Sequence, residues 1–247
     1  MNGKIYLVGV GPGDSSSMTS RANRILKNAH VVIGHKTCLD LLWKSVVGKE
    51  IIAAKMTPVQ RAETAVCKAL EGRDVAIVSS GDSGIYAIAS TFFGYLKDNS
   101  IELEVEVVPG VTVASAAAAL LGAPLGHDFA VISVADQATE WEATRKRLQA
   151  AAEADFVVVL YNPIGKIGYG RLQETAGILL KHRQASTPVG IVKGIATERE
   201  KVAIVTLDGL SDSYVAVDTM IIIGNTETFV HNGRMITPRG YLEGVGY

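Results

Sequence analysis

The sequence has few cysteines and no excess of charge of either sign. Cys38 and Cys67 are the only cysteines and form no Cys-x-x-Cys motif, which is too few for a disulfide framework. We therefore expect a reducing, cytoplasmic compartment. Lys and Arg total 24, Asp and Glu total 25, and the formal charge is -1. A protein that binds nucleic acid by neutralising phosphates needs a basic tail or stripe, so the composition argues against a nucleic-acid partner.

The sequence also lacks a long uninterrupted hydrophobic run. The longest stretch of small apolar residues, 111–125, is interrupted by Ser115, Gly122 and Pro124. A membrane-spanning helix needs about 20 consecutive apolar residues, so we predict no membrane association. The first ten residues have neither the basic flank nor the cleavage pattern of a secretory signal.

Signatures of metal binding and of covalent catalysis are missing as well. His35 and Cys38 are the only His and Cys close together, and no further ligands follow at zinc-site spacing. We therefore predict no bound metal. Residues 81–84 read Gly-Asp-Ser-Gly, but a nucleophile elbow requires G-x-S-x-G.

What the sequence does contain is an alternation of continuous apolar runs with segments of helical periodicity. The run at 156–160 has no polar alternation, which is typical of strands covered on both faces. At 101–107 glutamates alternate with apolar residues, which indicates a strand with one wet face near a sheet edge. Capping boxes at 57–60 and 139–142 predict helix starts. The alternation predicts α/β architecture, with buried strands at 4–8, 31–33, 75–78, 129–134, 156–160, 189–192 and 220–223.

A cluster of Gly and Pro at 121–126 is the best candidate for a joint between domains. It separates an N-terminal α/β domain, 1–121, from a C-terminal α/β domain, 122–247. Each part has enough predicted strands for its own sheet. We predict a ligand cleft between the two domains, because such clefts are common ligand positions.

Four loops rich in glycine or asparagine follow predicted strands. In open α/β sheets ligands bind at the carboxyl ends of the strands, so the four loops indicate a site lined by backbone and small side chains. The first loop is not a dinucleotide fingerprint, because Asp14 replaces the last glycine and Pro12 has no amide for a phosphate. This argues against an NAD-dependent dehydrogenase. The loops are 9–14, 80–84, 108–112 and 161–163.

Together the loops resemble the tetrapyrrole methyltransferase superfamily, whose members use S-adenosylmethionine (SAM). The matching segments, in order, are 8–14, 81–86, 108–112 and 187–190. Further segments resemble the precorrin-3B C(17)-methyltransferases, which are the ring-contraction enzymes of the cobalamin pathway, and their relatives that act on cobalt-factor III. These segments are 127–133, 154–156, 160–163, 187–192 and 233–241. Two segments depart from the family pattern. Residues 164–167 read Ile-Gly-Lys-Ile where the family often has a basic stretch, and residues 134–137 read Val-Ala-Asp-Gln where Leu-Ser-Asp-Leu is more usual.

The resemblance implies a SAM-dependent enzyme, with SAM folded between two α/β domains of a homodimer. By motif correspondence, the SAM contacts are Gly81, Asp82, Ile85, Thr112, Val113, Tyr161, Asn162, Gly190 and Thr219. The loop that borders the tetrapyrrole substrate includes Gly11, Pro12 and Gly13. Ring contraction also requires proton transfer, for which the candidates are Asp14, His127, Asp128 and Asp136.

A tetrapyrrole of this pathway carries many carboxylates, whereas the chain has almost no net charge to attract them. Local cations must then bind the substrate. We take Lys166 and Arg234 as substrate-binding residues, from a wider set that also includes Lys36, Lys55, Arg171, Lys193 and Arg239.

Other functions fit parts of the same pattern. A sibling methyltransferase that acts at another ring carbon would share most of the motifs, and a non-catalytic tetrapyrrole carrier would bind substrate without SAM. A relative that methylates ribosomal RNA is disfavoured by the balanced charge. The sequence does not distinguish a cobalt-containing substrate from a metal-free one.

Overall fold

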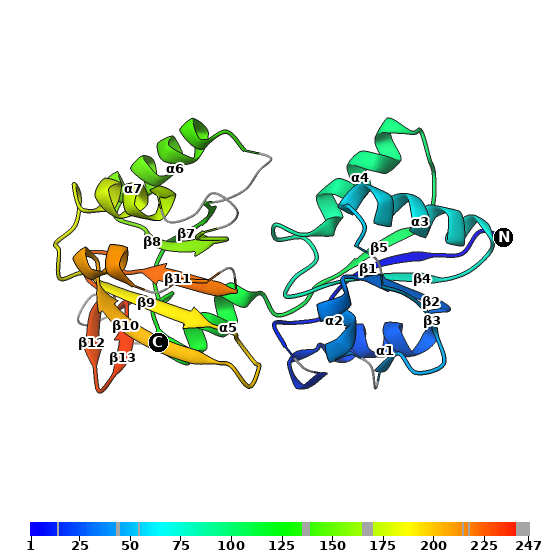
Figure 1. Ribbon diagram of the computed structural model, residues 1–247, viewed down its shortest axis with the longest axis horizontal. Coiled ribbons are helices and arrows are strands. Elements are labelled where there is room, and N and C mark those ends of the chain that lie inside the picture. Colours follow the sequence, from blue (N-terminus) through cyan, green and yellow to red (C-terminus); the bar gives the residue numbers. More distant parts are fainter. Residues whose placement is uncertain are drawn as a thin grey trace. The chain divides into compact units, whose positions relative to one another are not determined.

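The computed structural model describes residues 1–13, 15–42, 45–53, 55–134, 139–164, 170–213, 215–216 and 218–240. The chain divides into two compact units, Met1–Val113 and Ala114–Tyr247. The units contain two five-stranded sheets and one three-stranded sheet, with helices packed against them (Figure 1). The predicted α/β class is confirmed. Within the described residues, no helix is long and apolar enough to span a bilayer.

The first unit is built on a sheet of order β3-β2-β4-β1-β5, in which every pairing is parallel. Its strands are β1 (Ile5–Gly9), β2 (Val31–Gly34), β3 (Glu50–Ala53), β4 (Val75–Ser79) and β5 (Val105–Val108). Its helices are η1 (Ser15–Ser17), α1 (Ser20–Asn28), α2 (Lys36–Leu41), α3 (Pro58–Leu70) and α4 (Ile88–Asp98). Of the strand predicted at 101–107, only the second half belongs to a strand, β5, which lies at an edge of the sheet as expected.

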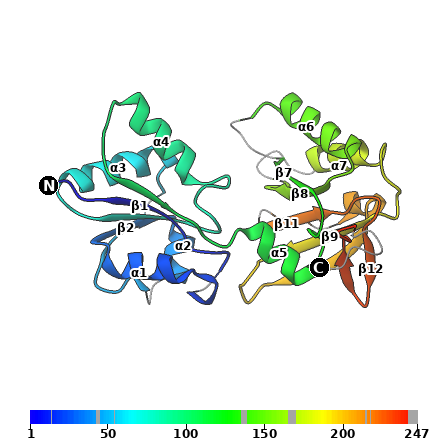
Figure 2. The same ribbon diagram turned by 180° about the vertical axis from the view of Figure 1, so that it is seen from behind.

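Helices cover both faces of this sheet, which explains why its strands are apolar without alternation. In β1, Ile5 and Leu7 belong to the core shared with α3 and α4, whereas Val8 belongs to the core shared with α1 and α2. Figures 1 and 2 show these two pairs of helices on opposite sides of the strands. The capping box predicted at 57–60 is confirmed, since Thr57 Oγ1 accepts from the Gln60 amide and Gln60 Oε1 accepts from the Thr57 amide.

The second unit contains a mixed sheet of order β10-β9-β11-β8-β7. Only the pairing of β7 with β8 is parallel. The main-sheet strands are β7 (Phe129–Ser133), β8 (Val157–Tyr161), β9 (Pro188–Lys193), β10 (Lys201–Thr206) and β11 (Thr219–Ile223). The helices are α5 (Val113–Leu121), α6 (Trp141–Glu153), α7 (Gly170–Leu179) and η4 (Asp208–Asp212). A small sheet of order β12-β13-β6 consists of β6 (Gly122–Ala123), β12 (Phe229–His231) and β13 (Arg234–Ile236).

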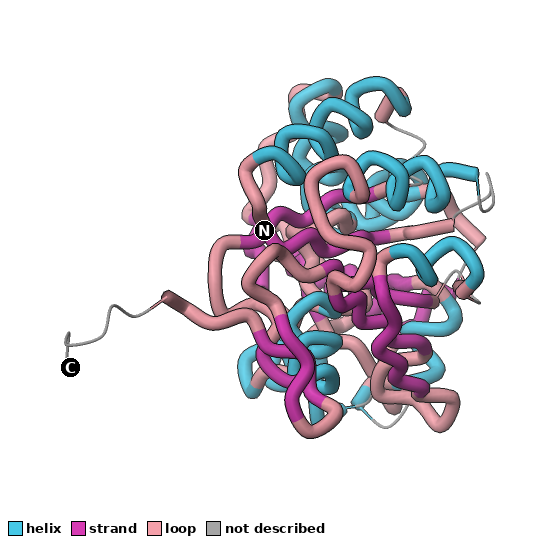
Figure 3. The backbone as a smooth tube through the Cα atoms, turned by 90° about the vertical axis from the view of Figure 1, so that its left-hand side faces the viewer, coloured by secondary structure: helices cyan, strands magenta, loops and turns pink. Residues whose placement is uncertain are grey.

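One face of the main sheet in this unit packs against α6 and α7 (Figures 1 and 3). The prediction of a capping box at 139–142 is wrong, because it requires Thr139 as the N-cap. The N-cap of α6 is Glu140, whose side chain makes no capping hydrogen bond. Tertiary packing of Trp141 and Leu148 against the core holds this helix instead.

Helix α5 lies beside β9 and β11 (Figure 2). Leu121 packs so closely on β9 that a Cβ added to Gly190 would lie 2.3 Å from Leu121 Cδ1. The segment after α5 pairs with β13 as β6. The division into compact units falls after Val113, eight positions before the predicted boundary at 121/122. The Gly and Pro cluster at that boundary contains β6 and a turn.

Candidate functional site

In the first unit, the three loops predicted to bind ligand lie together. They follow β4, β1 and β5, which are adjacent in the sheet and parallel, so all three loops emerge at the same edge. Gly11 and Gly81 form an isolated antiparallel bridge. The Gly11 amide donates to the Gly81 carbonyl at 3.0 Å, and the Gly81 amide donates to the Gly11 carbonyl at 2.7 Å. Backbone groups alone thus join two of the loops.

Glycine is required where these loops meet. A Cβ on Gly110 would lie 2.2 Å from the Gly81 carbonyl oxygen, and a Cβ on Gly9 would lie 2.6 Å from the Gly110 amide nitrogen. Gly11 and Gly81 also have φ angles of 78° and 70°, which side chains disfavour. We call this meeting point of the loops 9–11, 81–84 and 110–112 the loop junction.

Asp82 braces the loop junction. Its Oδ1 accepts from the Gly84 amide at 2.8 Å, and its Oδ2 accepts from the Gly110 amide at 2.9 Å. Beneath it, the buried Ser83 hydroxyl is 3.0 Å from the Leu7 carbonyl oxygen. The side chain of Asp82 therefore shapes the loops, and each carboxylate oxygen keeps a lone pair for a further donor.

The remaining predicted SAM contacts of the first unit lie on the same loops. Ile85 is exposed, and Thr112 and Val113 are half-buried. A Cβ at Gly81 would be 3.5 Å from Val113 Cγ1, so these loops touch at that point. Tyr86 adopts a φ of 49°, a strained conformation for an aromatic residue that marks a tightly specified turn. The structure thus brings the predicted residues of this unit together.

In the second unit, three predicted SAM contacts lie at one edge of the main sheet. β8 ends at Tyr161, and the antiparallel register, with Ile221 opposite Leu160, brings Thr219 level with Asn162. Asn162 has a φ of 48° and donates from Nδ2 to Ser133 Oγ at 3.2 Å. We call this edge, where β7 and β8 end and β11 begins, the Asn162 edge.

Gly190 lies inside β9, opposite Ile222, and not at the end of the strand. The absence of a side chain there is already explained by the contact with Leu121 of α5. A contact between Gly190 and SAM stays a prediction.

His127 and Asp128 are not at the Asn162 edge. They immediately precede β7, whose far end is Ser133, and five strand residues at ~3.3 Å each span about 17 Å. Both residues line a separate pocket of about 330 Å³, together with Asp155 and Phe156. The Asp128 amide donates to His127 Nδ1 at 2.7 Å.

The other predicted substrate and proton-transfer residues belong to different parts of the chain. Gly11 and Gly13 lie in the buried part of the first loop, and Pro12 is half-buried. Arg234 is exposed on β13. Asp14, Asp136 and Lys166 lie outside the described residues. In the described part of the chain, no cluster of three or more His, Cys, Asp or Glu is suited to a metal ion.

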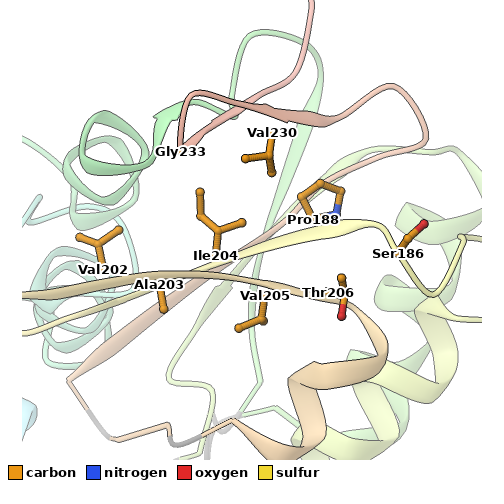
Figure 4. Close-up of a pocket in the computed structure, with 9 residues that line it drawn as sticks. All are labelled: Ser186, Pro188, Val202, Ala203, Ile204, Val205, Thr206, Val230 and Gly233. Atoms are coloured by element: carbon orange, nitrogen blue, oxygen red, sulfur yellow. The ribbon is translucent and has the colours of Figure 1, made fainter.

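A groove along β10 in the second unit was not predicted from the sequence (Figure 4). It has a volume of about 730 Å³. Val202 and Val230 are 45% and 46% exposed there, which is unusual for strand residues of this size. The groove is lined by Ser186, Pro188, Val202, Ala203, Ile204, Val205, Thr206, Val230 and Gly233.

Comparison with known proteins defines the class. The family of tetrapyrrole (corrin/porphyrin) methylases matches residues 4–211, and the chain belongs to this family. Among solved structures, the methyltransferase CobJ superimposes with a TM-score of 0.87 at 28% identity, covering 96% of this chain and 100% of that one. A uroporphyrin-III C-methyltransferase from Thermus thermophilus, complexed with S-adenosylhomocysteine, has a TM-score of 0.72 at 25% identity and covers 90% of this chain and 97% of that one.

Curated relatives narrow the class further. The chain is 39% identical to a protein of Salmonella typhimurium named probable cobalt-factor III C(17)-methyltransferase, over 96% of this chain and 99% of that protein. It is 40% identical to the cobalt-factor III methyltransferase of Priestia megaterium over 98% of this chain, but it spans only 46% of that longer protein. The predicted resemblance to the C(17)-methyltransferases is thereby confirmed.

Proposed function

We propose that the chain is a SAM-dependent methyltransferase of cobalamin biosynthesis. It would methylate C(17) of precorrin-3B or cobalt-factor III with ring contraction. The observation that carries this proposal is the match to the Salmonella relative, which extends over nearly the whole of both chains. A sibling enzyme that acts at another ring carbon is the second candidate, because solved relatives with other substrates share the fold.

The loop junction fits SAM chemically. Glycines join its three loops, and the Asp82 carboxylate has lone pairs that can accept from ribose hydroxyls. SAM supplies a methyl group already activated by a cationic sulfonium. In the first unit it would be held by Gly81, Asp82, Ile85, Thr112 and Val113, and in the second by Tyr161, Asn162, Gly190 and Thr219.

Because the methyl group arrives activated, the protein needs no covalent nucleophile. Its task is to hold the two reactants in line, and good alignment contributes roughly 7–11 kcal/mol to lowering the barrier. The backbone bridge between Gly11 and Gly81 and the brace from Asp82 to Gly110 supply the required rigidity. Gly11, Pro12 and Gly13 would border the tetrapyrrole.

Ring contraction also needs proton transfer. We retain Asp14 for this role, because it directly follows the loop 9–13 that reaches the loop junction. We do not retain His127 and Asp128, which precede β7 at the end remote from Asn162. Lys166 and Arg234 are proposed to bind substrate carboxylates.

We further propose that the protein is a cytoplasmic homodimer in which a second copy covers the groove along β10. β10 is an edge strand of the main sheet, and exposed valine side chains lie in the groove (Figure 4). Such an edge is prone to pair or to be covered.

Calorimetry with S-adenosylhomocysteine and with NAD, followed by turnover with ¹³C-methyl SAM, tests the enzymatic proposal. We expect binding of S-adenosylhomocysteine, no binding of NAD, and one labelled methyl group at C(17) of the product by NMR. A label at another ring carbon would establish the sibling activity. Tetrapyrrole binding without S-adenosylhomocysteine binding would instead indicate a carrier.

A further inference from the structure

One arginine of the wider set of candidate cations, Arg171, is held rigidly near the Asn162 edge. Arg171 is the second residue of α7. Its guanidinium lies over the Trp141 ring, 4.9 Å from the ring centroid, and its Nη1 donates to the Val134 carbonyl at 3.1 Å. Side chains and backbone from α6, α7 and the end of β7 therefore fix this cation together.

The position of this guanidinium follows from the backbone pairing. Val134 is the residue after β7, and its amide donates to the Tyr161 carbonyl at 2.9 Å. The preceding residue, Ser133, accepts from Asn162. Arg171 is thus anchored one residue away from the side-chain pair that marks the Asn162 edge.

Glu174, which contacts the same Trp141 side chain, is engaged by partners other than Arg171. Glu174 Oε2 accepts from Trp141 Nε1 at 2.7 Å, and Glu174 Oε1 pairs with Arg145 Nε at 2.8 Å. Arg145 also pairs with Glu142. Within the ranges that the structure describes, no ion pair joins Arg171 to a carboxylate of this chain. Trp141 is in turn oriented by Glu174, so the platform beneath the guanidinium is itself fixed.

We propose that Arg171 binds a carboxylate of the tetrapyrrole substrate, an inference that rests on the proposed function. An arginine whose planar head is stacked and hydrogen-bonded in advance loses little entropy on gripping a carboxylate, and charge-assisted pairs are the strong ones. In contrast, Lys36, another candidate cation, already pairs with Asp40 at 2.9 Å. The chain's formal charge of -1 makes a pre-oriented local cation valuable for attracting a polyanion.

The amino-acid part of SAM also carries a carboxylate, so the test must separate two ligands. We would measure the affinity of the full chain for S-adenosylhomocysteine by calorimetry and for a porphyrin octacarboxylate by fluorescence quenching. The variants are Arg171→Gln, which removes the charge, and Arg171→Lys, which keeps the charge but not the planar fork. Arg145→Gln is the matched control, because it removes a neighbouring arginine whose ion pairs among the described residues are with Glu142 of α6 and Glu174 of α7.

We expect Arg171→Gln to weaken porphyrin binding about tenfold or more, as loss of a charge-assisted hydrogen bond would, and Arg171→Lys to weaken it less. Affinity for S-adenosylhomocysteine and the melting temperature should stay at their wild-type values, as should all three quantities in Arg145→Gln. In turnover, KM for the tetrapyrrole should rise more than kcat falls.

Unchanged porphyrin affinity and unchanged KM in Arg171→Gln would overturn the inference. A loss of affinity confined to S-adenosylhomocysteine would also overturn it and would assign the arginine to the SAM carboxylate. An equal loss of affinity for both ligands, with a lowered melting temperature, would overturn it too and would indicate a structural role. Failure of the wild-type chain to bind S-adenosylhomocysteine or to methylate the tetrapyrrole would overturn the proposed function itself. That result can be told apart from failure of the Arg171 inference, because it does not depend on the variants.

Discussion

Asp82 Oδ2 accepts a hydrogen bond from the backbone amide of Gly110, 28 positions further along the chain, at 2.9 Å. The contact forms because β4 and β5 lie on either side of β1, so their following loops meet above the end of β1. One carboxylate therefore sets the relative position of two loops that are proposed to contact SAM.

This relationship predicts the behaviour of two Asp82 variants. Asp82→Ala removes both backbone contacts and the proposed ribose contact, so we expect affinity for S-adenosylhomocysteine to fall at least about tenfold. Asp82→Asn keeps one acceptor oxygen and should be intermediate. Calorimetry provides the measurement, and Asp98→Ala, at the exposed end of α4, is the control. Equal affinities for Asp82→Ala and Asp98→Ala would refute the role of this loop.

The contact distances at Gly110 predict a more severe effect. A Cβ added at Gly110 would lie 2.2 Å from the backbone carbonyl oxygen of Gly81. Even Gly110→Ala must therefore push the loops at 81–84 and 110–112 apart. We expect loss of S-adenosylhomocysteine binding together with lower stability, by about 1–3 kcal/mol. Gly94→Ala is the matched control, because nothing lies within 4 Å of its added Cβ inside α4. That control should raise the free energy of unfolding by about 0.5–1 kcal/mol, measured by urea denaturation.

A third prediction concerns alkaline stability. Burial raises the pKa of the Cys38 thiol from 9.0 to about 11, so between these values the unfolded chain releases a proton that the folded chain retains. Unfolding then becomes more favourable as pH rises through this range, by roughly 2 kcal/mol in total. Below pH 9 both states hold the proton and the effect vanishes.

Cys38→Ala should abolish this part of the pH dependence, while Cys67→Ala, at an exposed cysteine, should retain it. Urea denaturation at pH 8 and at pH 10.5 makes the comparison. A thiol-specific reagent at pH 8 should label Cys67 alone in the native protein. Rapid labelling of Cys38 would show that its pKa is not raised.

The strands that are buried on both faces could be predicted because every one of their residues must be apolar. Phe156–Leu160 predicted β8 to within one residue at each end, since helices and core side chains cover both sides. β10 was not predicted. The residues of β10 are mostly exposed, so an apolar residue there does not indicate a buried position. The position of β10 in the sheet depends on its pairing with β9.

The same distinction applies to the site. The loops at 80–84 and 108–112 could be identified one at a time, because each follows a buried strand and contains glycine. The brace from Asp82 to Gly110 could not, because it depends on the order of strands in the sheet. The position of His127 could not be predicted either. It was a candidate because it follows the proposed joint in sequence, whereas the direction of β7 places it at the end of the strand remote from Asn162.

The proposed dimer predicts an effect of charge in the groove along β10. Val202 is 45% exposed on this edge strand, so Val202→Lys costs little in an isolated monomer but places a cation in a covered apolar interface. We expect light scattering after gel filtration to give a dimer mass for the wild type and a monomer mass for the variant. Val47→Lys, at an exposed valine of the first unit, should remain dimeric. Dimers of both variants would show that this groove is not the interface.

The last prediction uses the positions of His127 and Asp128. Both are exposed at the start of β7, and the full strand separates them from Ser133, which contacts Asn162. A residue there cannot reach a proton on a substrate bound at the Asn162 edge, since general acid–base catalysis requires hydrogen-bond distance. We therefore expect His127→Ala and Asp128→Ala to keep kcat within about twofold of wild type, whereas removal of a true acid or base costs about 10²–10⁴-fold. Asn162→Ala, at the end of β8, should lower turnover through weaker SAM binding. Steady-state rates with labelled SAM measure all three, and a hundredfold loss of kcat in His127→Ala with unchanged S-adenosylhomocysteine affinity would restore the histidine to the catalytic site.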